Sequence, residues 1–344
     1  MVVTLQTEAR VNSNNHFKVK EEMKDMKASK FLKANKYLIV VLLFVAALSS
    51  CNSNDNEGEQ QIQLSGVTLD GDQECCSADE AILVRKFLYT VKPIPELSFA
   101  VGDKYTVSVY SKTGTFHVGY NELFFLATKN VTGNYVKDVD INNLIPLMYM
   151  AKMDVHHSAP ASTGAESFDE SILAVKRAWV SFIMDGEWTI GYDARVSGSK
   201  ESFAPVSIHV DALPEGQKWV QSFKAGGETY YLSLVNPTDW KTGSNTITAY
   251  VSQKSTSGVT PYQEASEEFT VDIDPRMPDM GFHTSPDNVS LTYQQEGLYA
   301  GTINLTMTGL WRIYLTIRDS KGNVVAGGDN TNDGFSSLYW DVTI

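Results

Sequence analysis

Short runs of alternating apolar and polar residues, separated by turn sequences, constrain the fold of this chain most strongly. Residues 105–110 and 269–274 alternate cleanly, and residues 302–307 and 311–317 suggest two strands around a tight turn. Turn clusters such as residues 111–114 recur about every dozen residues, and nothing after the N-terminal region shows a long period of 3.6. Short strands at this spacing predict an all-β fold built from sandwiches or barrels.

Length and charge narrow the possible functions. The chain has 344 residues, 42% of them hydrophobic, which is enough for about two domains with substantial cores. The net charge of −13 argues against nucleic-acid binding, because no basic stripe is present to contact phosphates. Three cysteines cannot provide a disulfide framework for a chain of this length.

The N-terminal region has the organisation of a secretory signal. A lysine-rich segment at residues 27–36 precedes an apolar run at residues 37–48, which is too short to span a bilayer. The small residues that follow and end at Cys51 resemble a bacterial lipobox, in which the cysteine is lipidated and becomes the first residue. We therefore expect residues 1–50 to be a signal peptide. The translation start could instead be Met23 or Met26.

An acidic segment follows the predicted lipidation site. We expect residues 51–79 to be a flexible tether, with membrane attachment supplied by lipid at Cys51. This places the protein in a bacterial cell envelope, as an outer-membrane lipoprotein facing either the periplasm or the cell surface. The adjacent Cys75 and Cys76 could pair with another chain, bind a soft metal or remain free thiols, and no role is assigned to them.

Sequence elements recur in the same order about 125 residues apart. Both copies contain Pro-x-Met, then Met-x-x-His-x-Ser, and finally Met-x-Gly-x-Trp. The first copy comprises Pro146, Met148, Met153, His156, Ser158, Met184, Gly186 and Trp188. The second comprises Pro275, Met277, Met280, His283, Ser285, Met307, Gly309 and Trp311. The repeat predicts two related domains at residues 80–205 and 206–344, joined near the polar segment 197–207.

These elements resemble the YtkA-like and FixH-like family of small immunoglobulin-like β-sandwich domains. Members lie outside the cytoplasmic membrane and are often associated with copper handling. The resemblance implies two tandem immunoglobulin-like sandwiches and a possible copper site, but it does not by itself imply catalysis.

Methionine and histidine in these elements suit Cu(I). Thioether sulfur is a soft ligand and imidazole a borderline one, so a set without carboxylates favours Cu(I) over Mg²⁺, Ca²⁺ or Mn²⁺. In the second domain the expected ligands are Met277, Met280, His283 and Met307, with the indole of Trp311 capping the cation. The prolines around this loop would stiffen it before metal capture.

The first domain offers a matching set with a longer gap between its methionines. Its expected ligands are Met148, Met153, His156 and Met184, with Trp188 as the capping ring. The neighbouring His157 has no counterpart in the second copy.

Two other interpretations remain open. The methionines could simply fill cores, since methionine packed against tryptophan is ordinary sulfur–aromatic packing. The protein could also be a surface-interaction or glycan-binding sandwich without metal, because exposed aromatic rings serve both roles. No nucleophile, zincin, phosphate-loop or dinucleotide motif is present, so we do not expect an enzyme. A metal-transfer partner in the envelope would remain to be identified.

Overall fold

The computed structural model describes residues 63–64, 67–68, 77–215, 217–255, 262–265, 267–328 and 334–344. The predicted signal peptide (residues 1–50), the lipidation site Cys51 and the pair Cys75–Cys76 lie outside these residues. Two short strands of the predicted tether, β1 (Gln63–Leu64) and β2 (Val67–Thr68), pair antiparallel. Within the described part, no helix is both long and apolar enough to cross a membrane.

A helix precedes the first sandwich. Helix α2 (Ser77–Leu88) begins inside the segment predicted as tether and carries acids in its first turn and bases in its last, which suits the helix dipole. Its buried Val84 packs in a small cluster with Phe124 of the outer sheet face. Glu80 accepts a hydrogen bond from the backbone N–H of Ala174, at 3.1 Å. The helix is therefore attached to the first domain by both apolar and polar contacts.

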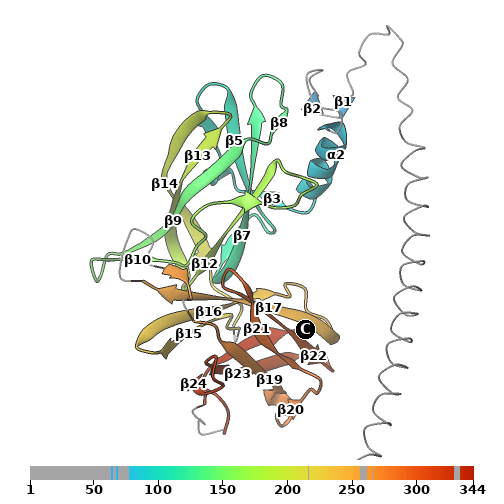
Figure 1. Ribbon diagram of the computed structural model, residues 1–344, viewed down its shortest axis with the longest axis vertical. Coiled ribbons are helices and arrows are strands. Elements are labelled where there is room, and N and C mark those ends of the chain that lie inside the picture. Colours follow the sequence, from blue (N-terminus) through green and yellow to red (C-terminus); the bar gives the residue numbers. More distant parts are fainter. Residues whose placement is uncertain are drawn as a thin grey trace, which may run out of the picture. The chain divides into compact units, whose positions relative to one another are not determined.

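The first domain consists of two sheets, which confirms the all-β prediction for this half of the chain (Figure 1). The five-stranded sheet has the order β10 (Val155–Ser158), β9 (Val139–Met150), β13 (Gly186–Val196), β14 (Ser199–Asp211) and β6 (Phe116–His117). The seven-stranded sheet has the order β11 (Glu166–Ser167), β12 (Val175–Phe182), β7 (Gly119–Lys129), β5 (Tyr105–Ser111) and β3 (Lys92–Pro93), with β4 (Phe99–Val101) on β5 and β8 (Tyr135–Val136) on β7. A 3₁₀ turn, η1 (Pro95–Leu97), links β3 to β4.

Alternation along these strands builds the first core. In β5 the buried positions are Val107, Val109 and Ser111, two residues apart, as the sequence pattern predicted. Phe125 and Trp188 from the two sheets belong to one apolar cluster. Apolar burial of this kind is the main favourable term for such a fold.

The second domain is one continuous, strongly bent sheet with a sandwich-like arrangement (Figure 1). Its strands run in the order β15 (Val220–Ala225), β16 (Glu228–Asn236), β17 (Gly243–Lys254), β22 (Leu298–Leu305), β21 (Val289–Gln295), β19 (Thr270–Met277), β23 (Leu310–Arg318) and β24 (Val324–Ala326). The branches are β18 (Tyr262–Glu264) on β17, β20 (His283–Thr284) on β19 and β25 (Tyr339–Thr343) on β23, and η2 (Pro278–Met280) follows β19. Trp311 and Trp340 are fully buried in its core.

Strand pairing follows one scheme in both domains. The pairs β5–β7, β7–β12, β9–β10, β9–β13 and β13–β14 correspond to β16–β17, β17–β22, β19–β20, β19–β23 and β23–β25. The corresponding strands β7 and β17 also share an asparagine near their first residues. Asn121 and Asn245 each bond, through the side-chain amide, three backbone groups two and four residues earlier.

The domain connection lies later than the sequence suggested. The predicted boundary at 205/206 falls inside β14, which pairs with β13 up to Val210. Strand β14 ends at Asp211, and β15 begins at Val220. Across the junction, the buried hydroxyl groups of Ser181 and Ser233 lie 2.6 Å apart and share a hydrogen bond. The rings of Trp179 and Tyr250 meet there at a centroid distance of 4.1 Å.

Candidate metal centre

Three residues of the second domain lie side by side at one end of its core. Met277 ends β19 and is paired directly with His283 on β20. On its other side β19 pairs with β23, and the register Arg276–Arg312, continued by one residue, places Met277 opposite Trp311. Directly opposed side chains of antiparallel strands share a face, with Cβ atoms about 5 Å apart. The imidazole and indole centroids are 6.4 Å apart, so His283, Met277 and Trp311 form a row.

The first domain repeats this row. Met148 is paired with His157 on β10, and the register Leu147–Thr189, continued by one residue, places Trp188 on its other side. Met148 and Trp188 are buried, with 7% and 1% of their surfaces exposed. We refer to His157–Met148–Trp188 and His283–Met277–Trp311 as the two His–Met–Trp rows.

In each Met-x-Gly-x-Trp element, the glycine lies next to the buried methionine of the row. Gly186 and Gly309 have φ of +118° and +129°, a conformation that other residues rarely adopt. A Cβ at Gly309 would lie 3.0 Å from the ε-methyl of Met277, and one at Gly186 would lie 3.3 Å from that of Met148. The glycines therefore leave the space that the two methionines occupy.

Met184 and Met307 contribute backbone groups to this arrangement. The indole N–H of Trp188 donates to the carbonyl of Met184 at 3.1 Å, and that of Trp311 donates to the carbonyl of Met307 at 2.9 Å. Both methionine side chains are partly buried against the cores. The same bond in both domains explains why tryptophan recurs four residues after methionine.

Substituting Gly309 with Ala tests the close contact between this glycine and the methyl group of Met277. We expect the variant to lose about 2–4 kcal/mol of unfolding free energy, from backbone strain and overpacking against Met277. Gly322→Ala is the matched control, because its φ is +84° but nothing lies within 4 Å of the added Cβ. Chemical denaturation measures both. Equal losses for the two variants would show that the methyl contact is unimportant.

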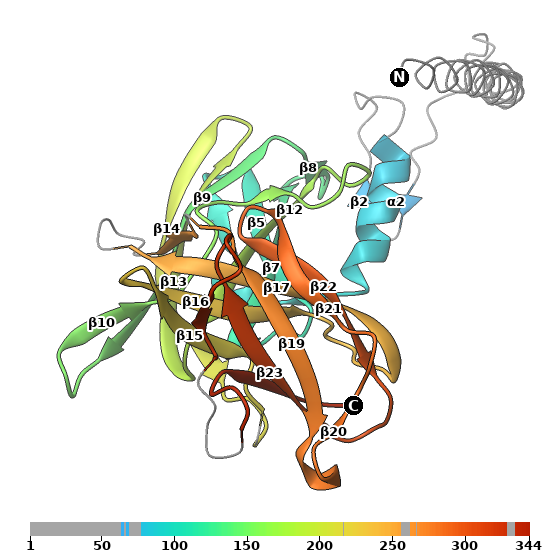
Figure 2. The same ribbon diagram turned by 60° about the horizontal axis from the view of Figure 1, so that its bottom comes forward.

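Two predicted ligands lie on the surface. Met153, in the turn of the β9–β10 hairpin, and Met280, in η2, are each 57% exposed. Figure 2 shows this hairpin extending past the rest of its sheet. His156 lies opposite Tyr149, its ring 4.9 Å from the tyrosine ring, on the other strand face from Met148. The structure does not bring Met153 or His156 into the first row.

His157 was noted beside His156 in the sequence but was not among the ligands predicted for the first domain. Its Nε2 atom is buried and has no hydrogen-bond partner among the described residues. An unpaired buried ring nitrogen is costly, and such a group calls for a water or an ion as its partner. Strand alternation from Met148 across a four-residue turn could have identified it, whereas matching Met-x-x-His alone pointed to His156.

The described residues form no cluster of the kind that binds harder metals such as Zn²⁺ or Ca²⁺. No three His, Cys, Asp or Glu side chains gather there in a way that could hold a metal ion. His209 is fully engaged with acids: its Nδ1 lies 2.6 Å from Glu187, and this hydrogen bond raises the pKa of the histidine. His117 bonds the carbonyl of Val118 through Nδ1 at 2.9 Å.

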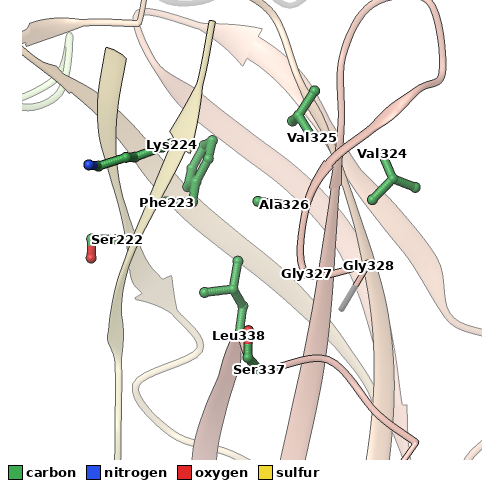
Figure 3. Close-up of a pocket in the computed structure, with 10 residues that line it drawn as sticks. All are labelled: Ser222, Phe223, Lys224, Val324, Val325, Ala326, Gly327, Gly328, Ser337 and Leu338. Carbon is green, nitrogen blue, oxygen red and sulfur yellow. The ribbon is translucent and has the colours of Figure 1, made fainter. Parts of the chain in front are cut away.

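A cavity of 520 Å³ lies between β15 and β24, away from both rows. Figure 3 shows Phe223 and Leu338 at its centre, with Val325 and Ala326 of β24 along one side. The described residues that line it include no methionine, histidine or cysteine. It is therefore not a candidate for a soft metal.

Known proteins show limited similarity to this chain. No curated protein matches the sequence. Structural similarity is found to invasin, a bacterial integrin-binding protein, at 15% identity and a TM-score of 0.19, covering 70% of this chain and 39% of invasin. It is also found to the adhesin InvE of Yersinia pseudotuberculosis, at 10% identity and a TM-score of 0.19, covering 67% of this chain and 55% of InvE. A DUF4785 family protein of Legionella pneumophila has 8% identity and a TM-score of 0.22, covering 70% of this chain and 56% of that protein.

The chain thus spans between 39% and 56% of the lengths of these structures. A family model gives the more specific result. It is described as YtkA-like and matches residues 224–316, which run from β15 into β23 and include Met277, His283 and Trp311. Residues 224–316 of the second domain are therefore similar to a YtkA-like domain.

Proposed function

We propose that this protein is a lipid-anchored, extracytoplasmic copper-binding protein with two related domains of the YtkA-like and FixH-like kind. The observation that carries the proposal is the repeated row, in which a histidine lies directly across from a buried methionine and beside a tryptophan. The family-model match lies in the second domain. The relationship of the first domain to the second is inferred from the shared strand pairing and the shared indole bond.

The donor chemistry supports Cu(I). In each row the methionine sulfur and an imidazole nitrogen would hold the ion, since both are neutral donors of the softness that Cu(I) prefers. The indole face of Trp188 or Trp311 would stabilise the cation without a bond to it. A thioether binds without releasing a proton, so the methionine contribution should persist in mild acid.

The two rows differ in access. His283 is exposed on an edge strand, whereas the Nε2 atom of His157 is buried. Met280 is exposed three residues before His283 and is not part of the second row. The second domain is therefore the better candidate for metal transfer to a partner in the envelope. The predicted lipid at Cys51 would keep both domains at the membrane surface.

Binding of Cu(I) can be measured directly. The full chain with Cys51, Cys75 and Cys76 replaced by Ser should bind about two Cu(I) ions in an anaerobic titration against a chromophoric chelator. Met277→Leu keeps the volume of the buried side chain but removes the sulfur, so we expect it to remove one of the two ions. Met280→Leu is the exposed control and should retain both.

Absence of binding by the cysteine-free chain would refute the copper proposal. It would leave the interpretation as a surface-interaction module without metal. Equal loss in the Met277→Leu and Met280→Leu variants would show that the second row is not the site.

A further inference from the structure

A cleft at the junction of the two domains is separate from both rows and has the lining of a ligand site. Its volume is 520 Å³. The first domain supplies residues 160–166 and part of β12, and the second supplies parts of β17 and β18 together with Glu296. Pockets at domain interfaces with a few convergent polar groups are common sites for small ligands.

Three aromatic rings contribute to the lining of this cleft. Trp179 and Tyr250, one from each domain, are both half-buried and lie 4.1 Å apart. Tyr120 stacks on Trp179 at 5.5 Å with an interplanar angle of 22°, which fixes the indole from behind. Tyr262 adds a further half-buried ring from β18. These rings hold little conformational freedom, so a ligand packed against them would pay a small ordering cost.

Hydrogen-bonding groups also contribute to the lining. Arg177 is paired with Glu166, while Gln263 and Glu264 are exposed on β18. Ser252 is the most informative of these groups, because its residue is only 2% exposed and its hydroxyl has no hydrogen-bond partner among the described residues. Ser252 follows Tyr250 by two positions on β17, so the two side chains share a strand face. A buried hydroxyl without a partner in a ligand-sized cleft calls for a ligand or ordered water.

We propose that this cleft binds a neutral saccharide. A sugar ring has an apolar face that packs on an aromatic ring and a rim of hydroxyls that bonds carboxylates, amides and guanidinium groups. The lining of the cleft offers both aromatic rings and hydrogen-bonding groups. Glu166, Glu264 and Glu296 outnumber the one guanidinium in the lining, so sugars carrying a carboxylate should be excluded by repulsion. This proposal does not depend on copper binding, because the cleft shares no residue with either row.

Saccharide binding can be tested on the full chain by saturation-transfer NMR and calorimetry. The probes are maltose, cellobiose and chitobiose, with digalacturonate as the anionic comparison. We expect at least one neutral disaccharide to bind with Kd of about 1 mM or tighter, and digalacturonate to bind at least about 10-fold more weakly.

Variants locate the binding to the cleft. Trp179→Ala should weaken it by about 10-fold or more through lost ring contact, and Ser252→Ala by about 3–10-fold through one lost hydrogen bond. Tyr89→Ala is the control, because Tyr89 is 78% exposed outside the cleft and should leave binding unchanged. Ser252→Ala removes one atom, so it remains informative if Trp179→Ala fails to fold.

The proposal is overturned if none of the neutral disaccharides binds, or if Ser252→Ala and folded Trp179→Ala both bind like the unmodified chain. Preferential binding of digalacturonate would overturn it as well. Retention of peptides, with no saccharide bound, would assign the cleft to a protein partner instead.

Discussion

His157→Ala is expected to abolish Cu(I) binding by the first domain, while His156→Ala leaves it intact. The two residues are neighbours in β10, but only His157 lies across from Met148, and its Nε2 atom is buried without a partner. Losing a group that only orients a metal ligand commonly costs about 10–100-fold in metal affinity, so loss of a direct ligand should exceed about 100-fold. A chelator competition in a Met277→Leu background isolates this site.

His156→Ala serves as a close control. His156 contacts Tyr149 on the opposite face of the hairpin, so its removal disturbs the same strand without touching the row. If His156→Ala instead lost the metal and His157→Ala kept it, the row would be wrong for this domain. The original sequence expectation of Met153 and His156 as ligands would then regain support.

Trp311→Ala is expected to be the most damaging single change to the fold of the second domain. Trp311 has no exposed surface, packs in the core with Met277 and donates to the carbonyl of Met307. Truncating a buried tryptophan costs about 3–5 kcal/mol, which is a large part of the stability of a typical domain. Equilibrium denaturation, followed by a probe specific to the second domain, measures the loss.

Trp311→Phe separates packing from the hydrogen bond. Phenylalanine fills most of the volume but leaves the Met307 carbonyl without its donor, so a smaller loss of about 1–3 kcal/mol is expected. A loss under about 1 kcal/mol for Trp311→Ala would mean that the tryptophan is not required for folding. The recurrence of Met-x-Gly-x-Trp would then need another explanation.

The fold class could be predicted because alternation is a local signal. Residues 105–110 alternate and lie in β5, and residues 269–274 alternate and, from Thr270 onward, form the first part of β19. The recurring elements could be recognised because each depends on a local geometry: a glycine with positive φ and an indole that reaches back four residues. Such local requirements restrict the residue types at fixed spacings, so they can be recognised in a single sequence.

The partner of each methionine could not be predicted, because it depends on the length of a turn. The first hairpin closes with Met150 opposite Val155, whereas in the second Met277 itself is opposite His283. A shift of one residue moves a side chain to the other face of the strand. The motif spacing therefore matched His283 with His156, although register matches it with His157.

Other features depend on distant contacts. Helix α2 has a weak apolar pattern and is held by Ala174 and Phe124, which lie far along the chain. The segment expected to join the domains instead contains most of β14, because pairing with β13 continues to Val210. The amides of Asn121 and Asn245 gave no recognisable signal, since asparagine after a turn has many uses.

The contact between each glycine and the methyl group of its methionine restricts how the proposed metal preference of these domains could be redesigned. Exchanging Met148 or Met277 for a shorter ligand such as cysteine would empty a space shaped for a longer side chain, and the core would suffer together with the site. The histidines lie on short outer strands and do not fill the core in the way the methionines do. A change in the metal preference of the proposed sites, by design or by mutation, would therefore replace the histidine. The methionine and its glycine would be kept together.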